Sequence, residues 1–188
     1  MVSRKQRPRL NGRHPVHVTM RVLPEIPSLR VLNGWVRRAL FAAANRPAFR
    51  IIHFSIQGSH VHLVAEADDS VSLSRGMQGL AIRIARAVNQ ALSRKRGKVF
   101  SDRYHEHVLK TPSEVRAAIH YVIHNYRKHM AEAGHPLRRD FVDDHSSAVY
   151  LAGLEPNPLP APRFWLSTHS PPSRSRARKA VCVPSEGT

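Results

Sequence analysis

Two histidines separated by a single residue, His60 and His62, are the clearest candidate metal ligands in the sequence. They open an apolar run through Ala65 that is typical of a β-strand, and alternate side chains of a strand project from the same face. Two imidazoles on one face can bind a single metal ion. The chain has 13 histidines, and His105 and His107 repeat the spacing, so solvated or core histidines are the alternative interpretation.

A tyrosine and an asparagine four residues apart, Tyr121 and Asn125, form a second candidate group. They follow residues Thr111–Glu114, a capping box with proline at the first helical position, which predicts a helix running to about Ala133. Residues four apart share a helix face, and we expect this face to point away from the buried stripe. A packing tyrosine with a solvated hydroxyl is the alternative, and Tyr104 and Tyr126 compete for any phenol chemistry. The stripe residues are Val115, Ile119, Val122 and Tyr126.

The segments that must position these side chains alternate between strand and helix patterns. A β-branched run predicts a first strand, and an apolar 3.6-residue period after Ser28 predicts a helix that Ser28 caps. Two further strand-like runs are joined by Gln57-Gly58-Ser59, which predicts a hairpin. A long basic amphipathic helix and a short strand follow. The expected elements are a strand at 14–22, a helix at 28–45, strands at 49–56 and 61–65, a helix at 73–93 and a strand at 106–109.

Charge restricts the class of partner. The 188 residues contain 30 Lys and Arg against 13 Asp and Glu, a net charge of +17, of which +15 falls in residues 1–135. Nucleic acid, an anionic membrane surface or an acidic protein are the usual partners of such a chain, and nucleic acid leads. No run approaches the roughly 18 apolar residues of a membrane-spanning helix. The single cysteine, Cys182, excludes an internal disulfide and a cysteine-built zinc site.

The densest basic stretch begins on the helix expected at 73–93 and continues through the turn after it. We interpret this stretch as a phosphate-contacting surface with few stacking rings, because aromatic residues make up only 6% of the chain. A solvated helix face is the alternative, and Trp35 is expected in the core. The candidate nucleic-acid-binding residues are Arg83, Arg86, Arg94, Lys95, Arg96, Lys98, Arg103 and Tyr104.

Four short stretches occur in an order that resembles a known family. They are residues 14–21 (HPVHVTMR), 57–64 (QGSHVHLV), 97–104 (GKVFSDRY) and 119–125 (IHYVIHN). Together, over about residues 5–130, they resemble the bacterial REP-associated tyrosine transposases, which are HUH-type single-strand DNA transposases. One departure is that the family usually continues after the asparagine with Pro-Val, whereas Tyr126 and Arg127 follow here.

The resemblance implies a fold and a set of roles. The fold is α+β, a ferredoxin-like antiparallel sheet with helices packed on it. His60 and His62 would bind a divalent metal, Tyr121 would be the nucleophile, and Asn125 stands where the family places an amide ligand. The metal would be Mg²⁺ or Mn²⁺; imidazole and amide ligands suit manganese better, and zinc fits the histidines equally well. No nucleotide cofactor is expected, because a 5′-phosphotyrosine link conserves the bond energy.

Three functions follow as alternatives. The first is a metal-dependent transposase that nicks and rejoins single-stranded DNA at hairpin or palindromic sites. The second is a catalytically inactive hairpin DNA or RNA binder on the same fold, and the third is a basic ribosome-associated or structural protein. His105 and His107 are interpreted as strand or loop histidines near the DNA. We expect a monomer or homodimer in the bacterial cytoplasm, associated with the nucleoid and not with a membrane.

Proline divides the chain into the expected units. Eight of the 14 prolines lie in the last 53 residues, where the charge is nearly balanced. The sequence therefore predicts a catalytic domain at 1–135, a wrap or linker at 136–169 that includes Phe164-Trp165-Leu166, and a disordered Pro/Ser/Arg-rich tail at 170–188.

Overall fold

A five-stranded sheet organises the chain. The computed structural model describes residues 10–168, and within them the strands pair in the order β2-β3-β4-β1-β5, antiparallel at every step. This sheet and its helices confirm the expected α+β fold. The strands are β1 (Val16–Arg21), β2 (Asn45–Arg46), β3 (Phe49–Ile56), β4 (His60–Ala67) and β5 (His105–Val108).

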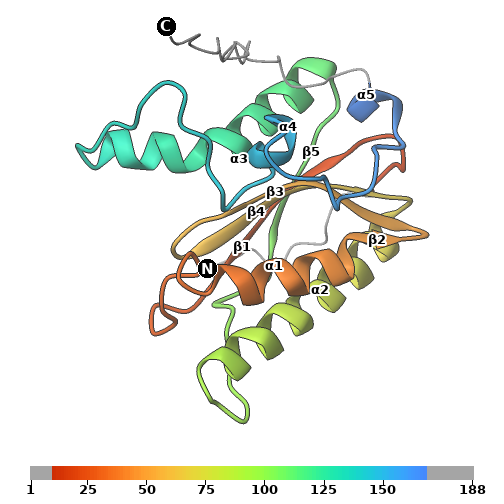
Figure 1. Ribbon diagram of the computed structural model, residues 1–188. Helices are drawn as coiled ribbons and strands as arrows, with labels where there is room; N and C mark the ends of the chain where they lie inside the picture. Colours follow the sequence, from red (N-terminus) through yellow and green to blue (C-terminus); the bar gives the residue numbers. More distant parts are fainter. Residues whose placement is uncertain (1–9, 169–188) are drawn as a thin grey trace, which may run out of the picture.

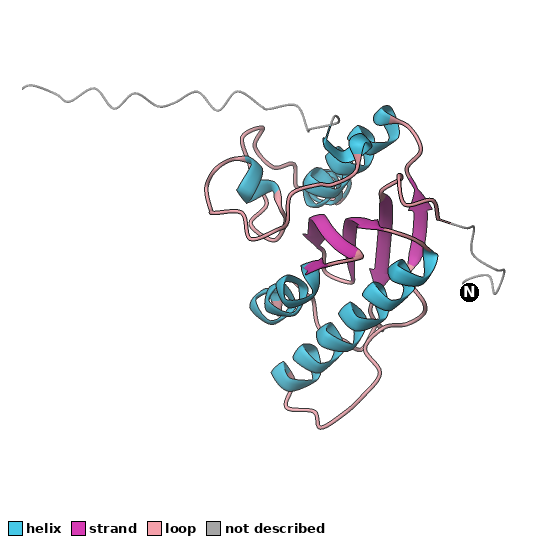
Figure 2. Ribbon diagram, turned by 90° about the vertical axis from the view of Figure 1, so that its right-hand side faces the viewer, coloured by secondary structure: helices cyan, strands magenta, loops and turns pink. Residues whose placement is uncertain are grey.

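Helices cover both faces of the sheet. Figure 1 shows α1 (Asn33–Ala44) and α2 (Ser70–Ala91) on one face and α3 (Pro112–Glu132) on the other, and Figure 2 shows the same layers from the side. Two short helices, α4 (Ala148–Leu151) and α5 (Trp165–Thr168), follow α3 along the chain. Among the described residues, no helix combines the length and the apolar character needed to cross a membrane.

Strand alternation separates the apolar core from the polar side chains. In β1, Val16, Val18 and Met20 are buried in the core cluster formed with α1 and α2. The intervening residues of β1 point to the face that α3 covers. On that face a smaller apolar cluster, including Val64 and Ile119, fixes α3 to the sheet. The sheet therefore has one predominantly apolar face, on which Glu106 of β5 stands opposite Val18, and one face that is partly polar.

Side-chain caps mark the starts of the two longest helices, α2 and α3. At α3 the Thr111 side chain accepts from the backbone N–H of Glu114, and the Glu114 carboxylate accepts from the backbone N–H of Thr111, which confirms the predicted capping box. The Asp69 carboxylate caps α2 by accepting from the N–H of Ser72 at 2.7 Å. The predicted hairpin at 57–59 is also confirmed, because β3 and β4 pair across it.

Two expectations around α1 were wrong. Ser28 does not cap the helix, because residues 28–32 form turns in which the N–H of Leu29 donates to the carbonyl of Gly58 at 2.8 Å, and α1 begins only at Asn33. Trp35 is not a core residue: 37% of it is exposed, and the Arg38 guanidinium lies 5.8 Å from its ring centroid. The two-residue strand β2 has no signal in the sequence pattern.

The segment after α3 returns to the sheet and is held there by buried polar contacts. The Asp143 carboxylate accepts from the Arg30 guanidinium at 2.8 and 3.2 Å, and the N–H of Ser147 donates to the carbonyl of Phe54 on β3. Glu66 on β4 accepts from the N–H groups of Arg163 and Phe164 at 2.8 and 3.0 Å. The expected tail at 170–188 lies outside the described residues.

Candidate active site

The two histidines of β4 lie side by side on the face covered by α3. Their ring centroids are 4.6 Å apart with nearly perpendicular planes. In the pairing with β1, His60 stands opposite Arg21 and His62 opposite Thr19. His62 is buried, with 4% of its surface exposed, and His60 is half-buried. The strand periodicity therefore placed both imidazoles correctly on one face.

Tyr121 projects from α3 toward this pair of histidines. Its ring centroid lies 5.1 Å from that of His62, in an edge-to-face arrangement. The tyrosine remains 37% exposed, so solvent reaches a side chain that also contacts His62. The Lys128 ammonium nitrogen lies 6.0 Å from the same ring centroid. The fold thus brings together side chains that are about 60 residues apart in the sequence.

Asn125 occupies a different position from the one expected. It is 1% exposed and belongs to the buried side of α3, whereas the sequence pattern placed it away from that side. The reason is that Asn125 follows Val122 by three residues, and such residues share a helix face. Tyr126, expected in the stripe, is half-buried, with the Arg30 guanidinium 3.5 Å above its ring.

The buried polar atoms of this site include several without a partner. Among the described residues, both the Oδ1 and Nδ2 atoms of Asn125 and the Nε2 atom of His62 are buried and have no hydrogen-bond partner. Such groups are rare, because each loses its hydrogen bonds to water on burial. An imidazole nitrogen and an amide oxygen are both metal ligands, so these residues fit a divalent cation.

The other nitrogen of His62 is held by neighbours on β1. His62 Nδ1 lies 3.1 Å from Thr19 Oγ1 and 3.3 Å from His17 Nε2. With its proton on Nδ1 and donated to Thr19, His62 presents the lone pair of Nε2 to a cation. Metal-binding histidines are commonly oriented in this way by a second group.

Burial lowers the pKa of three histidines on this face, His17, His60 and His62. It lowers the pKa of His62 to about 3, with further lowering from His60, His17 and His129, and it lowers the pKa of His17 to about 4, with a contribution from His107. The pKa of His60 is also lowered, first by burial and then by the charges of His129 and Arg21. Neutral imidazoles retain the lone pairs that bind a metal.

Sequence reasoning missed two neighbours of the site. His17 stacks on His62 with ring centroids 5.3 Å apart and meets Tyr121 edge-on at 5.6 Å. His129 lies one helical turn after Asn125, with its ring centroid 6.0 Å from that of His60. The available signals were strand alternation in residues 14–21 and the repeated four-residue spacing on α3.

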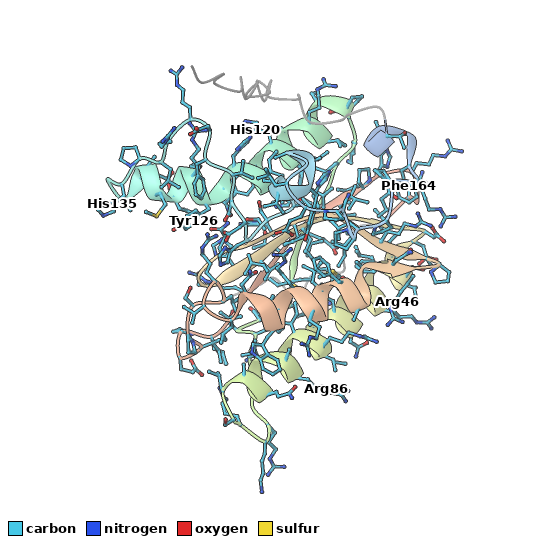
Figure 3. The ribbon with its side chains drawn as sticks, in the orientation of Figure 1. Arg46, Arg86, His120, Tyr126, His135 and Phe164 are labelled. Atoms are coloured by element: carbon cyan, nitrogen blue, oxygen red, sulfur yellow. The ribbon has the colours of Figure 1, made fainter. Side chains whose placement is uncertain are left out.

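The candidate nucleic-acid-binding residues lie on the other side of the sheet. Arg83 and Arg86 are on α2, which packs on the face opposite α3. The other basic residues of the set and Tyr104 are in the loop between α2 and β5. Figure 3 labels Arg86 on α2 and Tyr126 on α3, with the sheet between them.

His105 and His107 are exposed on the edge strand β5, opposite Thr19 and His17 of β1.

A second group of potential ligands occurs in the segment after α3. Ligand atoms of Asp143, Asp144 and His145 lie within 4.8 Å of one another. Asp143 is already bound to the Arg30 guanidinium, and His145 Nε2 lies 3.0 Å from the Arg30 carbonyl oxygen. These contacts fasten the segment to the residues before α1, which is a structural role.

Comparison of the chain with known proteins identifies its family. A family model described as IS200-like transposase matches residues 30–130, while no curated protein sequence matches the chain. A solved REP-associated tyrosine transposase bound to a REP hairpin superposes with a TM-score of 0.61 at 18% identity, covering 86% of this chain and 93% of that one.

A second solved structure, a candidate transposase from Deinococcus radiodurans R1, is more distant. Its TM-score is 0.40 at 13% identity, with 73% of this chain and 99% of that one covered, which is too low a similarity to bear on the fold. The family model, by contrast, spans just over half of the chain and includes both histidines, the tyrosine and the asparagine. This protein therefore belongs to the IS200-like transposase family.

Proposed function

We propose that this transposase cuts and rejoins single-stranded DNA through a covalent 5′-phosphotyrosine on Tyr121, with a divalent metal bound by His60, His62 and Asn125. The proposal is carried by the contacts of the Tyr121 ring with His62 and of His62 with His60, together with the buried amide of Asn125, which has no partner and lies one turn after Tyr121 on α3. A structural role explains the burial of His62, but it does not explain an amide with both polar atoms unpaired.

The metal and its protein ligands have separate roles in the proposed reaction. A bound divalent cation supplies charge neutralisation at the non-bridging oxygens of the scissile phosphate. His62 is oriented for this by Thr19, and Asn125 is fixed by its buried place on α3. We expect Mg²⁺ or Mn²⁺, and the imidazole and amide ligands favour Mn²⁺.

Tyr121 performs the covalent chemistry. Its phenol oxygen, having lost its proton, attacks the phosphorus, and the bond from phosphorus to the 3′ oxygen breaks. The 3′ oxygen takes up a proton to become a free hydroxyl, and the 5′ phosphate remains on the tyrosine. Attack by a 3′ hydroxyl on this phosphotyrosine reverses the sequence and restores the phenol. One phosphoester replaces another at each stage, so no nucleotide cofactor is needed.

The DNA partner follows from charge and from the solved relative. That relative is bound to a REP hairpin, and this chain carries a net charge of +17. We propose that hairpin-containing single-stranded DNA is the substrate, with the basic residues of α2 and the following loop contacting phosphates. Binding should then weaken steeply as salt increases, because bound counterions are released from the DNA.

A covalent-adduct assay tests the proposed function. The full chain is incubated with hairpin oligonucleotides carrying single-stranded flanks and Mn²⁺, and adducts are separated on a denaturing gel. We expect an adduct with the wild type and none with Tyr121→Phe or with Asn125→Leu. Tyr126→Phe, which removes the hydroxyl of a tyrosine on the same helix, is the matched control and should retain the adduct. Adduct formation by Tyr121→Phe would disprove the nucleophile, and binding without any adduct would favour an inactive hairpin binder.

A further inference from the structure

His129, one helical turn after Asn125 on α3, adds a third imidazole to the candidate metal site. Its ring centroid lies 6.0 Å from that of His60, with an angle of 83° between the ring planes. The centroids of His60 and His62 are 4.6 Å apart, with an angle of 86°. His60 therefore has one imidazole neighbour on its own strand and another on the helix that covers it.

These two spacings match those of imidazoles that bind the same ion. A metal–nitrogen bond is about 2.0–2.1 Å long, so the ring centroids of two such ligands are about 4.5 Å apart for perpendicular bonds and about 6.4 Å apart for opposite bonds. The separations of 4.6 and 6.0 Å both fall within this range. The His129 side chain is 45% exposed, so its ring can turn toward an ion without disturbing the core.

Neighbouring oxygens face the Nδ1 atom of all three histidines. The pairs are His60 with Ser59 Oγ at 3.1 Å, His62 with Thr19 Oγ1 at 3.1 Å, and His129 with a Glu132 carboxylate oxygen at 3.4 Å. An imidazole that donates its proton from Nδ1 keeps the lone pair on Nε2. A second group behind a ligating histidine, often a carboxylate, is the usual arrangement at metal sites. The three rings are thus oriented to offer Nε2.

We propose that His129 is a further metal ligand, so that three imidazoles and the Asn125 amide bind the ion. The inference rests on the proposed function, because it takes the divalent-metal site of that function as its starting point. Imidazole nitrogen suits transition-metal ions, whereas Mg²⁺ prefers oxygen ligands and retains its waters. His129 therefore makes the site selective for a transition-metal ion over Mg²⁺.

The alternative is that His129 acts only at the end of the helix. It lies in the last turn of α3, where a cationic side chain interacts favourably with the helix dipole, and it pairs with Glu132. That role gives no reason for the ring to face His60. His129 also contributes, after burial, to the lowered pKa of His60, and after burial, His60 and His17 to that of His62. It is therefore coupled electrostatically to both proposed ligands on β4.

Metal titration of the full chain tests the role of His129. The readouts are the Kd of Mn²⁺ for the metal-free protein, by isothermal titration calorimetry, and the Mg²⁺ concentration that displaces half of the bound Mn²⁺. His129→Ala places a strong helix former at an exposed position, so the fold should be preserved. Loss of a group that merely orients a ligand already costs about 10–100-fold in metal affinity, so Mn²⁺ binding should weaken at least about tenfold. The displacing Mg²⁺ concentration should fall in proportion.

His120→Ala is the matched control. His120, labelled in Figure 3, is an exposed histidine on the same helix, and its ring contacts that of His124 with centroids 4.4 Å apart. This variant loses the same side chain from α3 and should bind Mn²⁺ with the affinity of the wild type.

Three results would overturn the inference in distinguishable ways. Unchanged Mn²⁺ affinity in His129→Ala, while His60→Ala loses Mn²⁺ binding, would disprove the His129 ligand and leave the proposed function standing. Weakened Mn²⁺ binding with an unchanged displacing Mg²⁺ concentration would disprove the role of His129 in selectivity. Failure of the wild type to bind Mn²⁺, together with the absence of a Tyr121-dependent adduct, would overturn both the inference and the proposed function.

Discussion

The buried amide of Asn125 leads to a prediction in which stability and metal binding change in opposite directions. Asn125 is 1% exposed, and neither of its polar side-chain atoms has a hydrogen-bond partner among the described residues. An unsatisfied buried polar group costs about 1–3 kcal/mol of folding free energy. Asn125→Leu, which removes both atoms and keeps a similar volume, should therefore raise the free energy of unfolding of the metal-free protein by about 1–3 kcal/mol.

The same change should weaken metal binding. If Asn125 supplies a ligand, Asn125→Leu should lower the affinity for Mn²⁺, measured by isothermal titration calorimetry, by at least about tenfold, equivalent to about 1.4 kcal/mol. Stability is measured by urea denaturation of the metal-free protein, in which a changed midpoint with an unchanged slope reports a change in stability. A stabilised protein with weakened metal binding is typical of a residue retained for function.

Asn89 provides the matched control. It is also a buried asparagine on a helix and its Oδ1 likewise has no partner among the described residues, but its Nδ2 donates to the carbonyl of Gly97 at 2.9 Å. Asn89→Leu removes this bond together with the unpaired oxygen, so it should stabilise the protein less than Asn125→Leu does, while Mn²⁺ affinity stays unchanged. A loss of more than 1 kcal/mol in Asn125→Leu, with Mn²⁺ affinity intact, would refute our reasoning about Asn125.

Three further predictions concern the fold. Arg30→Met removes the partner of Asp143, which is 3% exposed, and should cost about 3–5 kcal/mol in urea denaturation; a loss below 1 kcal/mol would show that the pair is not a buried one. Burial lowers the pKa of His53 from 6.5 to about 4, so the unfolded chain binds more protons between these values and stability should fall by up to about 3 kcal/mol as pH drops through this window. His53→Gln should reduce that slope, and an unchanged profile would contradict it. Gly76→Ala places a methyl group against the ring of Phe49 and should lower stability by about 1–3 kcal/mol, visible as a lower Tm, unless the ring can shift.

Local patterns were sufficient for much of the architecture. The alternation around His60 and His62 predicted a strand with both imidazoles on one face, and the Thr111–Glu114 capping box predicted the start of α3, because both features depend on residues close together in the chain. The Ser28 cap was wrong because the backbone before α1 is engaged by Gly58, a contact that local spacing does not report.

The amino-acid sequence by itself determined which chemical groups exist and which strand or helix carries each. His60 and His62 shared a strand face, and Tyr121 and Asn125 were one helical turn apart, whatever the rest of the chain did. Only the tertiary structure decided that α3 crosses the sheet over His62, that Asn125 is buried without a partner, and that His17 and His129 join the group. It also placed the basic loop on the opposite face. These outcomes depend on how the helices pack on the sheet, which is settled by contacts between residues far apart in the sequence.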